Sequence, residues 1–416
     1  MLLANRAQGW HQAAMHPNAH RSPRALALSS LVAVLDKRQT LDEAIAPLAD
    51  DARLHAELRG LCMATLRHLG QIDALLKPYL EKPLAPKRVH VRAALRLGVA
   101  DLRVQGHAAH AVVHDLVEAV KHSADRALAG MVNAVLKRVA ADAPALPDCR
   151  FNLPTSVEAR WKAHYGKAIT DAICRVAAQR PPLDLHTSQD FAEGMRLDAA
   201  IWRMPALHAP VASLPGYAEG TFFVQDVAAS YPVRLLGALQ GKTVLDIGAA
   251  PGGKTAQLAR AGAQVVALDK SARRMARLQQ NMDRLGLSVE AMVADAMEYI
   301  PPTPFDAVVL DAPCSATGTW RRHPEVVHIT TLDDITELAA TQRALLRRAW
   351  GWVKPGGKLL YCVCSLEAEE GEQQRDWFAQ HFPEATLLEQ RRTTPAELEA
   401  QGGMDGFFMF VVRKPV

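Results

Sequence analysis

The sequence predicts a multidomain protein, with an all-α bundle in front, a small α+β connecting module and a final α/β domain with a mostly parallel sheet. Between residues 22 and 140, valine and leucine recur at helical spacing and no run reads as a strand. From Phe222 onward, short apolar runs alternate with helical segments, which is typical of a doubly wound sheet. At 416 residues, the chain is long enough for two or three domains, each with its own core.

Local composition suggests where these domains begin and end. The proline-marked link ADAPALPD (Ala141–Asp148) closes the helical part. The first residues lack the continuous apolar core of a signal peptide, and we expect them to be disordered. The expected division is a disordered start at residues 1–20, a helical domain at 21–145, a connecting module at 146–220 and an α/β domain at 221–416.

Helix signals run through the front of the chain. Ser22 is placed as an N-cap with Pro23 at the first helical position, and an apolar face follows from Leu26 to Leu35. We expect further helices over residues 41–48, 53–69, 71–80, 87–104, 108–122 and 127–140. The connecting module is expected to contain helices over 157–165 and 168–178, followed by short strand-like pieces.

The α/β domain is organised around VLDIGAAPGGKT (Val244–Thr255), which reads as a strand, a glycine turn and a helix start. Its glycines let the backbone approach a ligand where a Cβ would clash. The next strand, 263–268, leads to Asp269, and an acid at this distance suits hydrogen bonds to the two hydroxyls of a ribose. The pattern is neither G-x-G-x-x-G nor a P-loop, and Pro251 has no N–H for a pyrophosphate. A nucleoside without phosphates, such as S-adenosylmethionine, fits better.

Later strands add acids at the same expected edge of the sheet. Asp269, Asp295 and Asp311 follow successive strands, and ligands bind at the carboxyl ends of parallel strands. Each aspartate alone could be a helix cap or a turn residue, but together they predict one site. The expected elements after Asp269 are strands at 291–295 and 307–315, a helix over 334–353, a strand at 358–365, a helix over 369–381 and a closing hairpin.

Composition and charge narrow the class of protein. The net charge is +4, and residues 1–145 hold 19 Lys and Arg against 13 Asp and Glu, a net of +6 that favours a polyanion partner. Six cysteines in so long a chain make no disulfide framework, and no apolar run is long enough to span a membrane, so we expect a cytoplasmic protein. His107, His110 and His114 have helical spacing, but no cysteine or carboxylate completes a zinc site, and no metal is expected.

Two stretches of the helical part carry a family resemblance. The sequences LRLGVADLRVQGHAAHAVVHDLVEAVK (Leu95–Lys121) and MVNAVLKR (Met131–Arg138) resemble the NusB-like domain at the front of bacterial ribosomal RNA cytosine-5 methyltransferases of the Sun/RsmB (Fmu) family. The resemblance covers nearly the whole chain from about Arg24. It implies an RNA-contacting domain whose candidate phosphate contacts are Arg24, Arg67, Arg92, Arg96, Lys121, Lys137 and Arg138.

The same resemblance implies that the α/β domain is Rossmann-like and binds S-adenosyl-L-methionine. The glycine loop is expected to hold the methionine part, Asp269 the ribose and Asp295 the adenine. The sequence departs from the family at Gly248, where a cysteine usually precedes AAPGGK. The implied cofactor-binding residues are Gly248, Ala249, Ala250, Pro251, Gly252, Gly253, Lys254, Asp269, Asp295 and Asp311.

Two cysteine motifs, DAPC at 311–314 and CVCS at 362–365, indicate cytosine chemistry. Carbon 5 of cytosine accepts a methyl group only after a thiolate has added to carbon 6 and pushed electron density onto carbon 5. By resemblance, Cys364 is the nucleophile, Cys314 assists release of the product, and Asp311 hydrogen-bonds the base edge.

Other interpretations of the cysteines stay open. Cys314 could be the attacking thiol, as in DNA cytosine methyltransferases, or both thiols could belong to the core or, with Cys362, hold zinc. The threonine of the family's T-C-S motif is Val363 here, so what orients the thiol is open. We expect Lys254 or a helix N-terminus to favour the Cys364 thiolate.

The loop GTWRRHPEV (318–326) follows the first cysteine motif. Arg321 and Arg322 are expected to meet phosphate, and Trp320 to stack on a base. The target base must leave its stack to reach both thiols, which favours a single-stranded loop as substrate.

We therefore expect an enzyme that transfers a methyl group from S-adenosyl-L-methionine to carbon 5 of a specific cytosine in small-subunit (16S) ribosomal RNA through a covalent cysteine–cytosine intermediate. The alternatives are transfer RNA as the substrate, or a catalytically inert RNA-binding or antitermination-like factor. The expected partner is ribosomal RNA, without a membrane or a metal, and we expect a monomer.

Overall fold

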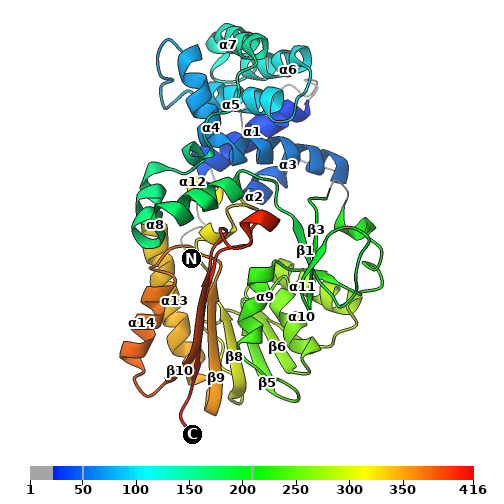
Figure 1. The fold of residues 1–416 in the computed structure, drawn as a ribbon, viewed down its shortest axis with the longest axis vertical. Coiled ribbons are helices and arrows are strands. Elements are labelled where there is room, and N and C mark those ends of the chain that lie inside the picture. Colours follow the sequence, from blue (N-terminus) through cyan, green and yellow to red (C-terminus); the bar gives the residue numbers. More distant parts are fainter. Residues whose placement is uncertain (1–21, 49–50, 208–209) are drawn as a thin grey trace.

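A computed structural model describes residues 22–416 except 49–50 and 208–209, so the predicted disordered start at 1–20 lies outside the described residues. A helical domain stands at one end of the molecule and an α/β domain at the other (Figure 1). Among the described residues, every strand comes after residue 182. The predicted order of an α-helical part, a small mixed module and an α/β domain is confirmed.

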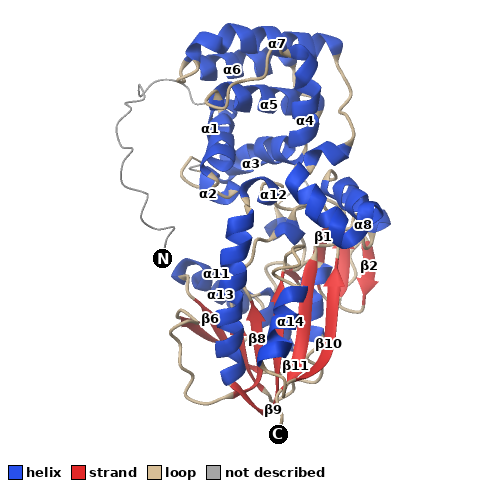
Figure 2. Cartoon of the chain, turned by 90° about the vertical axis from the view of Figure 1, so that its left-hand side faces the viewer, coloured by secondary structure: helices blue, strands red, loops and turns tan. Residues whose placement is uncertain are grey.

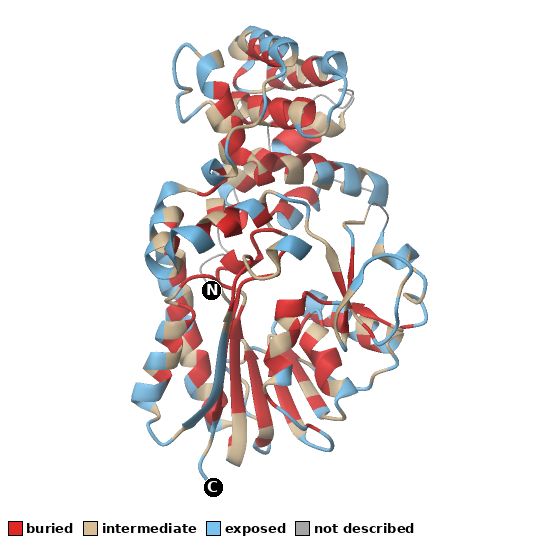
Figure 3. Ribbon diagram, in the orientation of Figure 1, coloured by how far each residue is buried: buried red, intermediate tan, exposed pale blue. Residues whose placement is uncertain are grey.

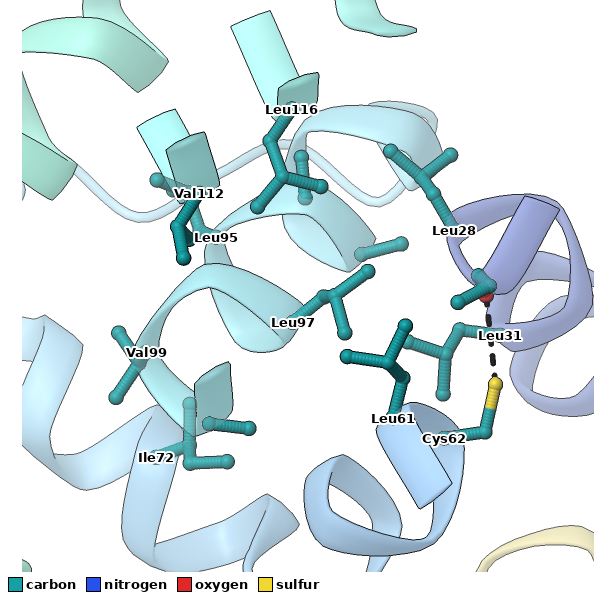
Figure 4. Close-up of a cluster of buried hydrophobic side chains, with 14 of the residues drawn as sticks. Leu28, Leu31, Leu61, Cys62, Ile72, Leu95, Leu97, Val99, Val112 and Leu116 are labelled. Carbon is teal, nitrogen blue, oxygen red and sulfur yellow. Dashed lines mark hydrogen bonds between the residues drawn. The ribbon is translucent and has the colours of Figure 1, made fainter. Parts of the chain in front are cut away.

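The helical domain is wrapped around one central helix. In α5 nearly every side chain between Val91 and Leu102 is buried, because the helix is covered by neighbours on most sides. Figure 4 shows Leu95, Leu97 and Val99 of this helix among apolar side chains of the surrounding helices. The elements are α1 (Pro23–Lys37), α2 (Leu41–Ile45), α3 (Ala52–Arg67), α4 (Leu69–Leu76), α5 (Val89–Arg103), α6 (Ala109–Lys121) and α7 (Ala129–Asp142).

The helix signals in this part of the sequence are confirmed, with shifts of a few residues at the ends. The Ser22 side chain accepts a hydrogen bond from the backbone N–H of Ala25 at 3.3 Å, as an N-cap should. The two helices predicted at 157–165 and 168–178 are both present within α8 (Thr155–Ala177), and they meet at a kink at Gly166, whose backbone is not helical and has a φ of +80°. Glycine permits this left-handed conformation without a steric cost.

The connecting segment packs onto the α/β domain. Buried residues of α8, such as Trp161, share an apolar cluster with Trp320 and Leu366. The domain boundaries at 145 and 220 stay predictions. A small antiparallel sheet in the order β2-β3-β1-β4 follows α8, and it comprises β1 (Leu183–His186), β2 (Met195–Asp198), β3 (Ile201–Met204) and β4 (Phe223–Val224).

The described strands of the α/β domain form a seven-stranded sheet in the order β10-β11-β9-β8-β5-β6-β7. The five strands from β9 to β7 in that order pair in parallel, and the β10–β11 hairpin adds to β9 antiparallel. The strands are β5 (Thr243–Ile247), β6 (Gln264–Asp269), β7 (Glu290–Val293), β8 (Phe305–Asp311), β9 (Val353–Val363), β10 (Thr386–Thr393) and β11 (Phe407–Arg413).

Helices lie against the large sheet (Figure 2), and buried residues run along its central strands (Figure 3). This arrangement buries the near-continuous apolar runs of β5 and β8, which explains why those strands are not alternating in sequence. The helices are α9 (Val227–Arg234), α10 (Gly253–Arg260), α11 (Ala272–Arg284), α13 (Leu332–Gly351) and α14 (Glu372–His381).

The helical domain docks near the carboxyl ends of the parallel strands. Nη1 of Arg67 at the end of α3 donates to the carbonyl of Ala177 at 2.9 Å and to that of Arg321, in the loop after β8, at 2.7 Å. Burial lowers the pKa of Arg67 to about 10. The short helix α12 (Val326–Ile329) lies at the same seam, where Arg38 of the helical domain donates to the carbonyl of Ile329 at 2.8 Å.

Candidate active site

The glycine turn after β5 brings two strand ends together. Gly248 has a φ of +75°, and a Cβ on it would lie 2.4 Å from the carbonyl oxygen of Asp311, so only glycine fits. At the end of β6, Oδ1 of the buried Asp269 accepts from the N–H of Ser271 at 2.9 Å. Its Oδ2 accepts no hydrogen bond from the described residues, and Nη1 of Arg274 is 3.3 Å away. An open carboxylate acceptor beside a tight turn fits the ribose of S-adenosyl-L-methionine.

Asp295 lies beyond the end of β7 and is exposed. Its Oδ1 accepts a hydrogen bond from the N–H of Met297 at 2.8 Å, which closes the turn after the strand. This turn role is the alternative that the sequence allowed for each lone aspartate. The contact of Asp295 with adenine stays a prediction.

Lys254 and Asp311 form an ion pair beneath the strand ends. Nζ of Lys254 lies 2.8 Å from Oδ2 of Asp311 and 5.3 Å from the centre of the Phe407 ring. Burial by itself lowers the pKa of Lys254, but Asp311, Cys362 and Asp246 raise it above its ordinary value. Lys254 therefore keeps its charge at neutral pH, and Asp311 presents a paired carboxylate at the edge of the site.

The two predicted catalytic cysteines meet. Sγ of Cys314 lies 3.5 Å from Sγ of Cys364, because the strands that precede them, β8 and β9, pair in parallel with Asp311 opposite Cys362. The hydrogen bond with Cys364, burial and the Glu370 charge raise the pKa of Cys314 well above its ordinary value. Cys314 therefore keeps its proton, and its S–H can donate a hydrogen bond to Sγ of Cys364.

The third thiol of the motifs has a different neighbour. Cys362 is fully buried, and its Sγ lies 3.6 Å from Oδ1 of Asp311. Burial raises the pKa of Cys362 well above its ordinary value, and Lys254 opposes that rise. Among the described residues, no group of three or more histidine, cysteine, aspartate or glutamate side chains is arranged to hold a metal ion.

Arg322, in the loop after β8, pairs with a buried acid. Its Nε donates to the two carboxylate oxygens of Asp405 at 3.0 and 2.8 Å. Burial lowers the pKa of Arg322, but Asp405 raises it above its ordinary value, with smaller contributions from Asp226 and Cys364. Lys254 pairs with Asp311. The expectation that Lys254 or a helix N-terminus favours the Cys364 thiolate stays a prediction. A phosphate contact by Arg322 stays a prediction.

Three predictions for RNA contacts are wrong, because the side chains are buried. Arg321 is 1% exposed, and its guanidinium pairs with Asp405 at 3.0 Å and with Asp226. Trp320 is also 1% exposed, and it packs edge-on against Trp161. Arg67 donates to carbonyl groups at the domain seam. None of the three can reach a phosphate or a base without unfolding its surroundings.

Two of the remaining basic residues of the helical domain belong to internal ion pairs. Arg24 pairs with Asp101 at 2.6 Å and Asp115 at 2.9 Å, and Arg96 pairs with Asp73 at 2.6 Å. Contacts of these two cations with phosphate stay predictions. A phosphate would have to compete with the carboxylates that already pair with the two guanidinium groups.

The other four basic candidates reach the surface. Lys121, Lys137 and Arg138 are exposed, whereas Arg92 is half-buried, and its Nη2 donates to the carbonyl of Ala85 at 3.3 Å. Lys137 and Lys121 line a groove of about 700 Å³ between α6 and α7, together with His110 and His114. Their contacts with RNA stay predictions.

The sequence interpretation missed two buried acids. The Asp405 carboxylate forms ion pairs with both Arg321 and Arg322. The Glu370 carboxylate accepts hydrogen bonds from Ser315 and Ser365. Glu370 lies in the run LEAEEGE, which looks like a solvated acidic surface. No local signal distinguishes Glu370 from the other acids of the run, such as the half-buried Glu369 and Glu372, since its burial comes from segments far along the chain.

This geometry defines a class. A sheet of mostly parallel strands closed by an antiparallel hairpin, with a glycine turn and the Asp269 carboxylate at adjacent strand ends, is typical of an S-adenosyl-L-methionine-dependent methyltransferase domain. When bound, S-adenosyl-L-methionine supplies an electrophilic methyl group. Among the described residues, no helix combines the length and apolar character needed to cross a membrane.

Sequence comparisons identify the family. Residues 233–409 match the description 16S rRNA methyltransferase RsmB/F, and residues 21–141 match the NusB family. Ribosomal RNA small subunit methyltransferase B of Xanthomonas campestris is 35% identical, covering 87% of this chain and 88% of the relative. That of Vibrio cholerae is 33% identical over 94% and 97%. The chain belongs to the RsmB/F family of 16S rRNA methyltransferases.

Solved structures agree with the fold. The structure of PH0851 matches with a TM-score of 0.73 at 23% identity, covering 94% of this chain and 99% of that one. A methyltransferase homologue from Pyrococcus horikoshii matches with a TM-score of 0.51 at 25% identity, covering 62% and 93%. The whole architecture, including the helical domain, therefore has a solved counterpart.

Proposed function

We propose that this protein methylates carbon 5 of a cytosine in small-subunit ribosomal RNA through a covalent bond between Cys364 and the base. The observation that carries the proposal is the 3.5 Å separation of the Cys314 and Cys364 sulfurs. The two thiols lie at the edge of the sheet where we propose that the methyl donor binds. Methyl transfer to carbon 5 needs one thiol to attack carbon 6 and a second group to accept the proton that leaves carbon 5.

In the proposed reaction, the Cys364 thiolate forms a bond to carbon 6, and the electron pair of the carbon 5–carbon 6 double bond becomes available at carbon 5. Asp311, paired with Lys254 at 2.8 Å, lies where it can hydrogen-bond the base edge as charge spreads through the ring. Carbon 5 then takes the methyl group, whose bond to the sulfonium sulfur would break and leave S-adenosyl-L-homocysteine. A base then removes the carbon 5 proton, the double bond forms again, and Cys364 leaves as a thiolate.

Cys314 is suited to be that base because its acidity depends on Cys364. In the resting site, the hydrogen bond and charge of Cys364 are major causes of the raised pKa of Cys314. Once Cys364 is a thioether, both causes disappear and the pKa of Cys314 falls. Cys314 can then lose its own proton to solvent, and the resulting thiolate takes the proton from carbon 5.

Tritium release from ribosomal RNA labelled at carbon 5 of cytosine tests the reaction. The wild type should release tritium, Cys364→Ser should form no adduct, and Cys314→Ser should accumulate a covalent protein–RNA adduct on a denaturing gel. The opposite pattern, with the adduct accumulating only in Cys364→Ser, would make Cys314 the nucleophile, as in DNA methyltransferases. No tritium release from any RNA would favour the inert RNA-binding factor.

The proposed substrate follows from the family and from the helical domain. We propose that residues 21–145 hold RNA through exposed cations such as Lys137 and Arg138, while the protein acts as a cytoplasmic monomer. Bisulfite sequencing of RNA from a deletion strain identifies the nucleotide. Loss of one 5-methylcytosine from small-subunit ribosomal RNA is expected, whereas loss from transfer RNA would overturn this choice of substrate.

A further inference from the structure

Glu370 lies between the two segments that carry the catalytic thiols. Ser315 follows Cys314 and Ser365 follows Cys364, and both serine hydroxyls donate to Oε2 of Glu370. The backbone N–H of Ser315 donates to Oε1 of the same carboxylate at 2.9 Å. One carboxylate therefore holds two Cys-Ser dipeptides that lie 50 residues apart in the chain.

A second layer of hydrogen bonds fixes Glu370 itself. Nε2 of Gln342, on α13, donates to Oε1 of Glu370 at 3.1 Å and to the carbonyl of Pro313, next to Cys314, at 2.9 Å. The hydroxyl of Tyr361, on β9, donates to the carbonyl of Glu370 at 2.7 Å. A shift of Glu370 would disturb contacts on the helix and both strand ends at once.

Burying the Glu370 carboxylate lowers the stability of the fold, because the side chain is 0% exposed and loses its contact with water. Burial raises the pKa of Glu370, and the hydrogen bonds from Ser315, Ser365 and Gln342 oppose that rise. A buried carboxylate held by neutral donors costs more than an apolar side chain of the same size. A glutamate at position 370 is therefore not explained by stability alone. Its carboxylate can accept hydrogen bonds from several segments at once and so hold them together.

We propose that Glu370 is a positioning residue that sets the distance between the Cys314 and Cys364 sulfurs and thereby controls release of the methylated base. This inference rests on the proposed function, in which Cys314 must reach the carbon 5 proton while Cys364 is bonded to the base. A displacement of about 1 Å in such an arrangement can reduce a rate by about 100-fold. Attack by Cys364 alone does not need the Cys314 distance.

Glu367 is the matched control, since it lies in the same loop and is 2% exposed. Its carboxylate accepts from Nε of Arg160 at 3.0 Å and from Nε1 of Trp161 at 3.1 Å, both on α8. The Glu367 carboxylate thus anchors the connecting helix α8, whereas the Glu370 carboxylate anchors the two serine hydroxyls. Loss of Glu367 should destabilise the fold without changing the spacing of the two sulfurs.

The first experiment compares Glu370→Ala, Glu370→Gln and Glu367→Gln for turnover and for the covalent RNA adduct. Glu370→Ala should lower turnover by about 100-fold and accumulate adduct as Cys314→Ser does. Glu370→Gln should keep most of the turnover, because an amide can still accept from the Ser315 N–H and donate to the serine oxygens. Glu367→Gln should accumulate no adduct. Equal behaviour of Glu370→Ala and Glu367→Gln would overturn the proposal.

A second experiment needs no RNA. Diamide, an azo oxidant, converts two neighbouring thiols to a disulfide and takes both protons and electrons to become a hydrazine. In a Cys362→Ser background, the Cys314–Cys364 disulfide should form at least about tenfold more slowly in Glu370→Ala than in its parent or in Glu367→Gln. Ser315→Ala, which removes one link without a large cavity, should be intermediate and serves if Glu370→Ala does not fold.

The two experiments separate the possible failures. If Cys314→Ser accumulates no adduct, the proposed function fails, and the disulfide rates still test whether Glu370 sets the sulfur distance. If Cys314→Ser accumulates adduct but Glu370→Ala neither accumulates it nor slows the disulfide, the positioning role is wrong and the proposed function stands.

Discussion

At the residue scale, the chemistry depends on paired groups that change each other's ionisation. Cys314 keeps its proton because Cys364 is its neighbour, and Lys254 keeps its charge because Asp311 is beside it. Asp246, in the middle of this group, is fully buried, and burial is the main cause that raises its pKa to about 7. The ionisation of Asp246 should therefore make the free energy of unfolding depend on pH.

Stability should fall as pH rises through the range set by Asp246. The unfolded carboxyl loses its proton near pH 4, but the folded one keeps it to about pH 7, so unfolding releases a proton between these values. The Asp246 contribution is complete below about pH 4 and declines by at most about 1.4 kcal/mol per pH unit up to about pH 7. Asp246→Asn lacks this contribution.

Urea unfolding of the wild type and Asp246→Asn at several pH values between 4 and 8 measures the effect. The variant keeps the hydrogen bond from Thr255, which donates to Oδ2 of Asp246 at 2.7 Å in the wild type. The difference in unfolding free energy between the two proteins should shift in favour of the variant as pH rises to about 7. A pH-independent difference would contradict the ionisation assigned to Asp246.

At the element scale, the close approach of three backbone segments supports the cysteine site. Gly318, in the loop after β8, donates its N–H to the carbonyl of Cys364 at 3.0 Å and accepts from the N–H of Gly406 at 2.8 Å. A Cβ on Gly318 would lie 1.9 Å from the Gly406 carbonyl oxygen. The loop, the end of β9 and the start of β11 can come together only because this side chain is absent.

Gly318→Ala should therefore displace the loop that carries Cys314. The clash is with backbone atoms that cannot rotate away, so we expect a loss of about 1–3 kcal/mol in unfolding free energy and at least a tenfold loss of turnover. Gly351→Ala is the control, because a Cβ there meets nothing within 4 Å. Calorimetry and tritium release check both variants, and equal effects would refute the role of the Gly318 contact.

At the scale of the whole molecule, a buried cation joins the helical domain to the catalytic edge. Arg67 donates to carbonyl groups of Ala177, Gln179 and Arg321, which come from the connecting segment and from the loop after β8. Any movement of the helical domain must therefore break contacts next to the catalytic loop. The domain that we propose holds RNA has a fixed position relative to the thiols.

Arg67→Met should loosen this seam. The substitution removes the hydrogen bonds that Arg67 donates to three carbonyl oxygens. It should lower the free energy of unfolding by about 1–3 kcal/mol, because buried acceptors lose their partner. Arg126→Met, at an exposed position of the same domain, is the control. A lower melting temperature and faster proteolysis between the domains are expected only for Arg67→Met. If both variants behave like the wild type, Arg67 does not hold the domains together.

Exposed cations of the helical domain should contribute to RNA affinity. Lys137→Gln with Arg138→Gln should weaken binding, and should reduce the slope of log affinity against log salt by about 0.7–0.9 for each phosphate that the variant no longer neutralises. The control is Lys242→Gln with Arg413→Gln, two exposed cations beside the amino ends of the parallel strands, away from the thiols. Equal slopes for the two double variants would place the RNA elsewhere.

The sequence by itself determined the features that depend on neighbouring residues. The Ser22 cap, the glycine turn at Gly248 and the acid at the end of β6 were all predictable, because each is specified by a few consecutive residues and by strand periodicity. The family resemblance added the pairing of Cys314 with Cys364, which spacing alone could not supply.

Tertiary structure alone decided which polar side chains face water. Arg67, Arg321 and Trp320 look like surface groups for RNA in the sequence, but segments from distant parts of the chain bury them. Glu370 is hidden in the same way inside an acidic run. The physical reason is that burial of a charge depends on the donors and partners that long-range packing brings to it, and no local pattern records those partners.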